Sequence, residues 1–229
     1  FLIGAFLVII LSYLVIAPIV SIFSNSVSLT MMDAMLSGGK DGEFTYKYVD
    51  RVFTSSISEK IFWIPLKNSL TVSFFATLIA LTLGLILASL VTSTNILGRK
   101  YLGFLLIIPY MLPSQAMATA WLTMFKNRKI SGPQGMLESF GITPPDWLAY
   151  GPLPISICMA LSYFPFAFLL FSSALGKIDI QLEEVASTFG AKTKAIWSKI
   201  ILPLLMPTTM SVLLLTVART LGTFATPYI

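Results

Sequence analysis

The sequence predicts an all-α, polytopic membrane protein. Of its 229 residues, 56% are hydrophobic and only 11% are charged. A soluble domain carries about 25% charged residues, so most of this chain's outer surface must face something other than water. Its long apolar stretches do not alternate apolar and polar residues, as the strands of a membrane β-barrel would. We therefore expect helices that span a lipid bilayer.

Five stretches are long enough to cross a bilayer, which takes about 20 apolar residues. They are residues 1–23, 69–92, 101–125, 152–176 and 201–229. The only charged side chain within them is Arg219. This pattern predicts an N-terminal transmembrane helix at 1–23, an external (periplasmic-side) loop at 24–68 and a core transmembrane domain at 69–229. Because the fifth span stops at Ile229 without a polar tail, we expect a truncated C-terminal end and at least one further helix.

The four connections differ in character. Gly38, Gly39 and Gly42 predict a flexible part of the first, and the third is rich in glycine and proline. Placing 93–100 and 177–200 in the cytoplasm puts six basic residues there, namely Arg99, Lys100, Lys177, Lys192, Lys194 and Lys199. The opposite loops hold eight but are more than twice as long, so the positive-inside rule weakly favours this orientation, with a cytoplasmic N-terminus.

Composition excludes several classes of site. The chain has no histidine, which excludes a histidine metal site or general base, and we expect no metal site. Its one cysteine, Cys158, cannot form an intramolecular disulfide. We interpret the net charge of +5 as loop charge near lipid head groups and expect no nucleic-acid partner.

A charged segment separates the fourth and fifth spans. Apolar residues recur at helical spacing at Ile178, Leu182, Val185, Ala186 and Phe189. Asp179 is the expected N-cap, and Gly190 suits the left-handed position after a helix. Because Pro203 fits the first turn of a new helix or kinks one, we predict two short amphipathic helices that meet at a glycine elbow. The alternative is an ordinary interfacial loop lying on lipid.

The residues of this elbow resemble the "EAA" signature of the membrane subunits of ATP-binding-cassette importers. That signature reads Glu-Ala-Ala, three residues, Gly, nine residues, Ile-x-Leu-Pro. The match here runs from Glu184 through Gly190 to Leu202 and Pro203, and only Val185 departs from it. The resemblance implies the type I importer permease fold, with cytoplasmic coupling helices that dock on an ATPase subunit.

Several expectations follow from that resemblance. The residues expected at the ATPase contact are Glu184, Ala186, Phe189, Gly190, Lys192, Leu202 and Pro203. The expected partners are cytoplasmic ATPase subunits, a second permease subunit or half, an extracytoplasmic solute-binding protein and membrane lipid. We expect no cofactor in this chain, with ATP and magnesium bound by the ATPase, because the sequence has no Gly-x-x-x-x-Gly-Lys-Ser/Thr loop. The location implied is the inner membrane of a prokaryote.

Weaker similarities extend along the chain. They are Lys67 to Ser73, Ile108 to Pro113 and Gly132 to Leu137, in the order in which such permeases have comparable segments. The whole looks most like the subgroup that serves ferric ion, polyamines, phosphonates and inorganic oxyanions. The expected cargo is thus a small polar or charged solute, and a fused double permease is an open possibility.

Polar residues within spans are candidates for a translocation path, because lipid offers them no partners. The candidates are Tyr110, Ser114, Gln115, Thr119, Arg219 and Thr223, with Thr226 beyond them. Arg219 would favour an anion, unless it snorkels to the interface or binds backbone carbonyls. Pro109 and Pro113 are predicted to break the third helix and Pro165 to break the fourth, and such a kink opens a cavity or is simple bending.

Two other functions are possible. An ion-driven secondary carrier usually has acidic residues or histidine within the membrane to bind the coupling ion, and the five spans have none. An intramembrane enzyme would need a nucleophile with a base, an acid pair or a metal cluster at membrane depth. Cys158 has no histidine to activate it, so the importer permease is the preferred interpretation.

Overall fold

The structure is a computed structural model that describes residues 2–223. The chain divides into two compact units, residues 1–67 and 68–229. Four helical stretches are long and apolar enough to cross a membrane, and a bent pair of helices gives a fifth candidate. The four are Ile3–Ser26, Glu59–Ser93, Asp146–Leu175 and Thr193–Gly222. The predicted all-α, polytopic class is confirmed.

The first unit begins with α1 (Leu2–Ser26), followed by α2 (Met31–Ser37) and α3 (Lys47–Thr54). The segment after α1 is held by a short antiparallel bridge between Ser28 and Phe44. Gly38 and Gly42 adopt positive φ angles of 73° and 79° in tight turns. Two of the three glycines in the predicted flexible part, Gly38 and Gly42, thus form turns, since glycine adopts this backbone without steric cost.

Asp33 joins these short helices. Its carboxylate accepts a hydrogen bond of 2.6 Å from the Tyr48 hydroxyl and pairs with the Lys47 ammonium at 2.9 Å. The Tyr48 hydrogen bond, and then the Lys47 contact, hold the pKa of Asp33 below its usual value. The carboxylate therefore ties α2 to the start of α3.

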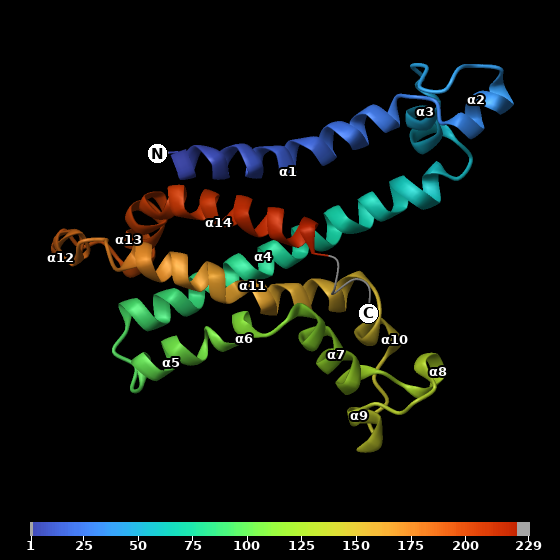
Figure 1. The fold of residues 1–229 in the computed structure, drawn as a ribbon. Helices are drawn as coiled ribbons and strands as arrows, with labels where there is room; N and C mark the ends of the chain where they lie inside the picture. The colour runs from blue at the N-terminus through green and yellow to red at the C-terminus, as the bar shows by residue number, and fades with distance from the viewer. Residues whose placement is uncertain (1, 224–229) are drawn as a thin grey trace. The chain divides into compact units, whose positions relative to one another are not determined.

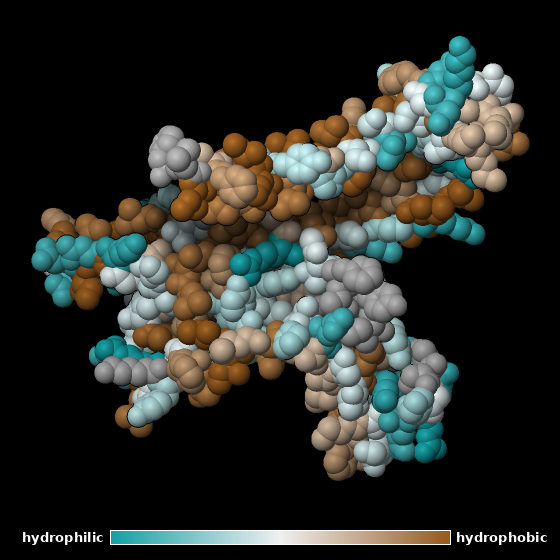
Figure 2. All heavy atoms as spheres, in the orientation of Figure 1, coloured by the Kyte–Doolittle hydropathy of each residue, from teal (hydrophilic) through white to brown (hydrophobic). Residues whose placement is uncertain are grey.

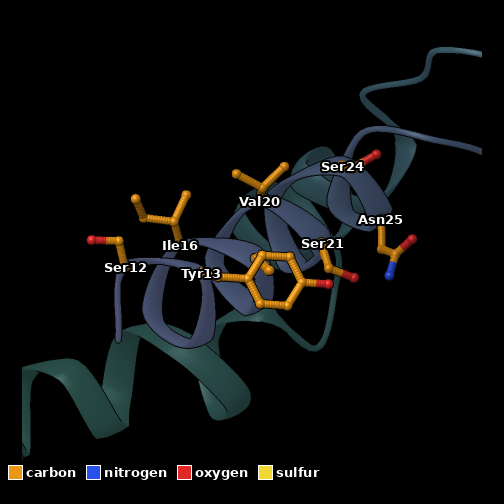
Figure 3. A pocket seen from close by; sticks show the side chains of 8 residues that line it. Ser12, Tyr13, Ile16, Val20, Ser21, Ser24 and Asn25 are labelled. Atoms are coloured by element: carbon orange, nitrogen blue, oxygen red, sulfur yellow. The ribbon is translucent and has the colours of Figure 1, made fainter. Parts of the chain in front are cut away.

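One face of α1 carries a groove with polar side chains (Figure 3). It is lined by Ser12, Tyr13, Ile16, Ala17, Val20, Ser21, Ser24 and Asn25. No residue of the membrane-crossing window of α1 is buried. A helix with hydroxyl and amide side chains inside lipid needs protein or water against that face.

A π-helical turn precedes a proline in two of the long helices. A π-helical turn, Glu59–Trp63 (η1), ends two residues before Pro65, and another, Trp197–Ile201 (η2), ends two residues before Pro203. Proline lacks the N–H of a helical bond, and its ring clashes with the carbonyl four residues earlier. The wider turn absorbs that clash and keeps each helix continuous. The helix η1–α4 therefore starts before the predicted boundary at residue 69, with α4 at Ile64–Ser93.

The second unit is built on three helices that run alongside one another: α4, α11 (Pro152–Leu175) and α14 (Leu202–Gly222) (Figure 1). Gly84 lets α4 approach α11 closely, because a Cβ there would lie 2.6 Å from that of Ala167. Close backbone approach at small residues is how helices pack in lipid, where the hydrophobic effect does not drive their association. Pro165 lies inside α11 without interrupting it, so the predicted break of the fourth helix is wrong.

The third span is broken. The helices α5 (Arg99–Leu105) and α6 (Ile108–Met111) are followed by α7 (Ser114–Phe125), and the chain bends by 94° before α7. Leu112 and Pro113 are extended at the bend, as a residue before proline prefers. The predicted break at Pro109 and Pro113 is confirmed. Both α6 and α7 pack against α11.

Three single-turn helices connect α7 to α11: α8 (Arg128–Ser131), α9 (Met136–Ser139) and α10 (Asp146–Ala149). The buried Asn127 amide donates to the Asp146 carboxylate at 2.7 Å. The Trp121 indole donates to the Leu148 carbonyl at 2.8 Å. These bonds order a loop that lies at the opposite end of the second unit from α12 (Figure 1).

Candidate coupling elbow and translocation path

The charged segment after α11 folds into α12 (Ile180–Thr188), which has a defined cap at each end. Asp179 accepts a 3.0 Å hydrogen bond from the Gln181 amide, which confirms the predicted N-cap. At the other end Gly190 has a φ of 82°, as predicted. The Ala191 amide donates to the Ala186 carbonyl at 3.0 Å, and the Gly190 amide donates to Ser187 at 2.9 Å. This pair of bonds is a Schellman motif, which fixes the direction of the chain after the helix.

The two sides of α12 have different surroundings. Ala186 and Ala191 pack against the apolar core formed by α4, α11 and the helical stretch Thr193–Gly222. Leu182, Val185 and Phe189 lie on one side of the helix and are exposed, and Phe189 keeps 87% of its surface. In Figure 2 hydrophilic residues gather at this end of the second unit, next to hydrophobic ones. The elbow thus presents an apolar face with no partner among the described residues.

The second arm of the elbow is continuous with the last span. Short α13 (Thr193–Ile196) runs through η2 into α14, and together they form one helical stretch, Thr193–Gly222. The prediction of two separate short helices is therefore wrong for the second, because the π-helical turn accommodates Pro203 without a break. Ile196 and Ile201 of this arm are buried in the same core as Phe171. The elbow is thus joined to α14 by continuous helix.

The remaining predicted elbow residues lie on its surface. Glu184 is exposed, and its backbone carbonyl accepts hydrogen bonds from Ser187 and Thr188 at 2.7 and 2.9 Å. Lys192 is exposed at the N-cap of α13, without a side-chain cap bond. Leu202 and Pro203 open α14 and are exposed. The signature residues therefore serve two purposes, since Ala186 and Gly190 shape the elbow and the others form its surface.

At the far end of α14 the structure brings two predicted path residues together. Arg219 donates a hydrogen bond from Nη1 to the Tyr110 hydroxyl of α6. Its guanidinium lies over two rings, with 4.6 Å to the centroid of Phe166 and 5.5 Å to that of Tyr110. The two rings are stacked, with centroids 6.3 Å apart. Among the described residues the guanidinium bonds to no backbone carbonyl, and an aromatic platform and a hydroxyl hold it.

Hydroxyl groups tie the same end of α14 to its neighbours. Thr223 donates to the Arg219 carbonyl at 2.7 Å, and the Tyr163 hydroxyl lies 2.5 Å from the Thr223 oxygen. The buried Ser73 and Thr220 hydroxyls lie 2.5 Å apart. A cavity of about 320 Å³ adjoins these bonds, with Asn68, Ser69, Thr220 and Thr223 among its polar lining. The end of α14 is thus fixed to α4, α6 and α11.

The other path candidates lie apart from this group. Ser114, Gln115 and Thr119 follow the bend on α7, and the Thr119 hydroxyl bonds to the Gln115 carbonyl of its own helix. Thr226 lies outside the described residues. Sequence reasoning missed Phe166, because an apolar residue in an apolar span carries no signal of its own. The signal that was available is its position three residues after Tyr163, on one helix face.

The chain matches known permeases along most of its length. A family described as binding-protein-dependent transport system inner membrane component matches residues 80–229. The sulfate transport system permease protein CysT of Salmonella typhimurium is 30% identical over 159 residues, 69% of this chain and 55% of that protein. The molybdenum transport system permease protein ModB of Escherichia coli K12 is 30% identical over 162 residues, 71% of this chain and 69% of that protein.

A relative of another cargo class covers more of the chain. The trehalose/maltose transport system permease protein MalF of Thermococcus litoralis is 28% identical over 96% of this chain and 76% of its own length. The chain spans about half the length of the sulfate permeases that it matches. These relatives are permeases of several transport systems, and the family match covers more than half of the chain. The chain belongs to the family of binding-protein-dependent transport system inner membrane components, the permeases of ATP-binding-cassette transport systems.

Proposed function

We propose that this chain is one permease half of an ATP-driven importer, and that its elbow at α12 docks on a cytoplasmic ATPase subunit. One observation supports this: the elbow has an exposed apolar face and is joined to α14 by continuous helix. Leu182, Val185 and Phe189 offer the side chains that a groove on a partner would bury. Because Ile196 and Ile201 anchor the same elbow in the core, motion of an attached ATPase reaches the membrane helices.

The proposal includes an orientation. With the elbow in the cytoplasm and the bent pair counted as a span, the N-terminus lies in the cytoplasm and the loops around α2, α3 and α8 to α10 lie outside. A solute-binding protein would deliver cargo to those outer loops. The cargo is a small polar or charged solute, and a second permease half completes the path. The polar groove of α1 supports a protein neighbour for that helix, since lipid satisfies none of its hydroxyls.

Substitution of Gly190 tests the docking. Asparagine and aspartate have similar shapes and both tolerate left-handed backbone, so Gly190→Asn and Gly190→Asp are a matched pair. Nothing lies within 4 Å of a Cβ at this position, so neither variant meets a clash. We expect Gly190→Asn to keep most transport and Gly190→Asp to lose it, because a carboxylate desolvated in the docking groove is costly.

The measurement is uptake by the full-length chain assembled with its ATPase and binding protein in proteoliposomes, beside ATPase binding by purified protein. Normal uptake by Gly190→Asp would count against docking at the elbow. The ion-driven alternative is tested in the same vesicles. Uptake that persists without ATP and stops with an uncoupler would replace the importer by a secondary carrier.

A further inference from the structure

Arg219 is the one charged side chain of the five predicted spans. Arg219 makes no ion pair among the described residues, where Lys47 pairs with Asp33 in the first unit. No aspartate or glutamate occurs in any of the five spans. A guanidinium in or near lipid without an anion is costly, so a partner that supplies negative charge would stabilise it.

The surrounding side chains orient the Arg219 guanidinium and leave donors accessible to an anionic partner. The faces of Phe166 and Tyr110 fix its plane, and the Tyr110 hydroxyl takes a bond from Nη1. A guanidinium has five N–H donors, and the part of the chain that the structure describes shows a bond from Nη1 alone. Arg219 is also exposed, so its remaining donors are accessible. A planar fork of donors fits two oxygens of one oxyanion, which is how arginine binds sulfate-like and phosphate-like groups.

Its position along α14 suits a contact with incoming cargo. Arg219 lies about 24 Å from Pro203 along the helix, at about 1.5 Å per residue. In the orientation proposed above, Pro203 is near the cytoplasm and Arg219 is therefore in the outer half of the bilayer. Tyr110 belongs to the short helix just before the bend at Pro113. The guanidinium thus lies beside the one broken span among the described helices, where transporters often place cargo sites.

We propose that Arg219, oriented by Tyr110 and Phe166, binds a small divalent oxyanion as the cargo passes, and so selects anions over cations. This inference rests on the proposed function as an importer permease. Arg219 is the binding residue, and Tyr110 is a positioning residue because it acts through the guanidinium. A phospholipid phosphate offers the same chemistry, so the test separates a free anion from a head group.

The test is chemical protection of arginine in the purified full-length chain. Phenylglyoxal modifies accessible guanidinium groups, and peptide mass spectrometry resolves Arg219 from Arg51, Arg99 and Arg128 of the same molecule. The protein is held in maltoside micelles, which contain no phosphate. Sodium sulfate and sodium molybdate are compared with sodium chloride at equal ionic strength, and a further arm adds phosphatidylglycerol.

We expect sulfate or molybdate to slow modification of Arg219 at least fivefold and that of Arg99 less than twofold. Equal slowing by chloride, or no slowing, would overturn the oxyanion site. Protection by phosphatidylglycerol alone would also overturn it and assign Arg219 to the lipid surface. Tyr110→Phe removes the orienting hydroxyl and keeps the ring, so we expect the sulfate concentration for half protection to rise at least threefold. An unchanged concentration would remove Tyr110 from the site.

Uptake by Arg219 variants is a second test of the oxyanion site. Arg219→Gln should lower uptake of sulfate or molybdate at least tenfold, and Arg219→Lys should retain part of it because the positive charge stays. Uptake of both oxyanions by Arg219→Gln at the unaltered rate would refute a cargo contact. The protection assay needs no ATPase, so its result does not depend on docking at the elbow. Either proposal can therefore be refuted while the other stands. Anion protection of Arg219 together with normal uptake by Gly190→Asp would refute only docking at the elbow. Absence of anion protection together with lost uptake by Gly190→Asp would refute only the oxyanion site.

Discussion

The amide of Ala191 donates a 3.0 Å hydrogen bond to the carbonyl of Ala186 across the left-handed backbone of Gly190. This contact closes α12 and places both alanines against the core. Six residues, Ala186 to Ala191, thereby set the direction of the chain between α12 and the long helix that begins at Thr193. The direction of the elbow is a property of this chain's own backbone, and a partner would find it already formed.

Gly190→Ala should therefore loosen the elbow without unfolding the bundle. A Cβ meets nothing there, so the cost is the left-handed backbone alone, about 1–2 kcal/mol. If that strain opens the cap, exchange of the Ala191 amide rises about 5- to 30-fold while core amides of α11 are unchanged. Hydrogen exchange with mass spectrometry measures both, and Gly190→Asn is the milder control. An Ala191 amide as protected as in the wild type would show that the cap does not depend on glycine.

Phe189→Ser should weaken ATPase binding and leave the fold intact. With 87% of its surface exposed, Phe189 contributes little to the stability of the free chain. An aromatic side chain central to an interface contributes about 2 kcal/mol or more to binding, so affinity for the ATPase should fall about 30-fold. The matched control is Phe140→Ser, also exposed (71%) but on the loop at the opposite end of the second unit. Equal effects of the two variants on ATPase affinity would argue against an interface at the elbow.

The elbow and the spans show how much sequence alone predicts. Local signals gave the N-cap at Asp179, the left-handed turn at Gly190 and the bend near Pro113, because each depends on the backbone chemistry of a few residues. The continuity of α13 with α14 was missed, since the tolerance of Pro203 depends on a π-helical turn that has no composition signal. The platform under Arg219 was missed because Tyr110 and Phe166 are brought together only by the packing of α6 on α11.

Pro203→Ala should remove the π-helical turn at Trp197–Ile201. Alanine restores the missing N–H and relieves the ring clash, so an ordinary α-helix becomes the more stable arrangement. Loss of that turn changes the helical register of α13 relative to α14, and buried Ile196 then leaves its place in the core. We expect uptake per ATP hydrolysed to fall severalfold, together with a lower Tm because Ile196 loses its burial in the core. Wild-type uptake per ATP would mean that the π-helical turn is not needed for coupling.

The Asp33 cluster predicts a pH dependence in the loop after α1. The pKa of Asp33 lies below the usual 3.8 in the folded chain. Its stabilising contribution is therefore complete above that value and is lost as pH falls through the lower, folded pKa. Titration of ¹³C-labelled aspartate by NMR should show Asp33 titrating below 3.8.

Two variants separate the causes of this shift. Tyr48→Phe removes the hydrogen bond that is the largest single cause, and Lys47→Gln removes a second hydrogen bond together with the positive charge, so each should raise the pKa of Asp33. An Asp33 pKa unchanged by either variant would exclude that residue as a cause. A titration of Asp33 at its ordinary value in the unaltered chain would show that the cluster does not form.

Gly84→Ala should destabilise the second unit, although alanine is the better helix former. A Cβ at Gly84 would lie 2.6 Å from the Ala167 Cβ and 2.9 Å from the backbone nitrogen of Phe168, so α4 and α11 must separate. Overpacking of this kind costs about 1–3 kcal/mol, against about 1 kcal/mol gained in helix propensity. Gly103→Ala is the control, because its Cβ meets nothing closer than 3.8 Å. Thermal unfolding of the full-length chain in maltoside micelles should show a lower Tm for Gly84→Ala and an equal or higher one for Gly103→Ala. Equal midpoints for the two variants would mean that α4 and α11 are not in close contact at Gly84.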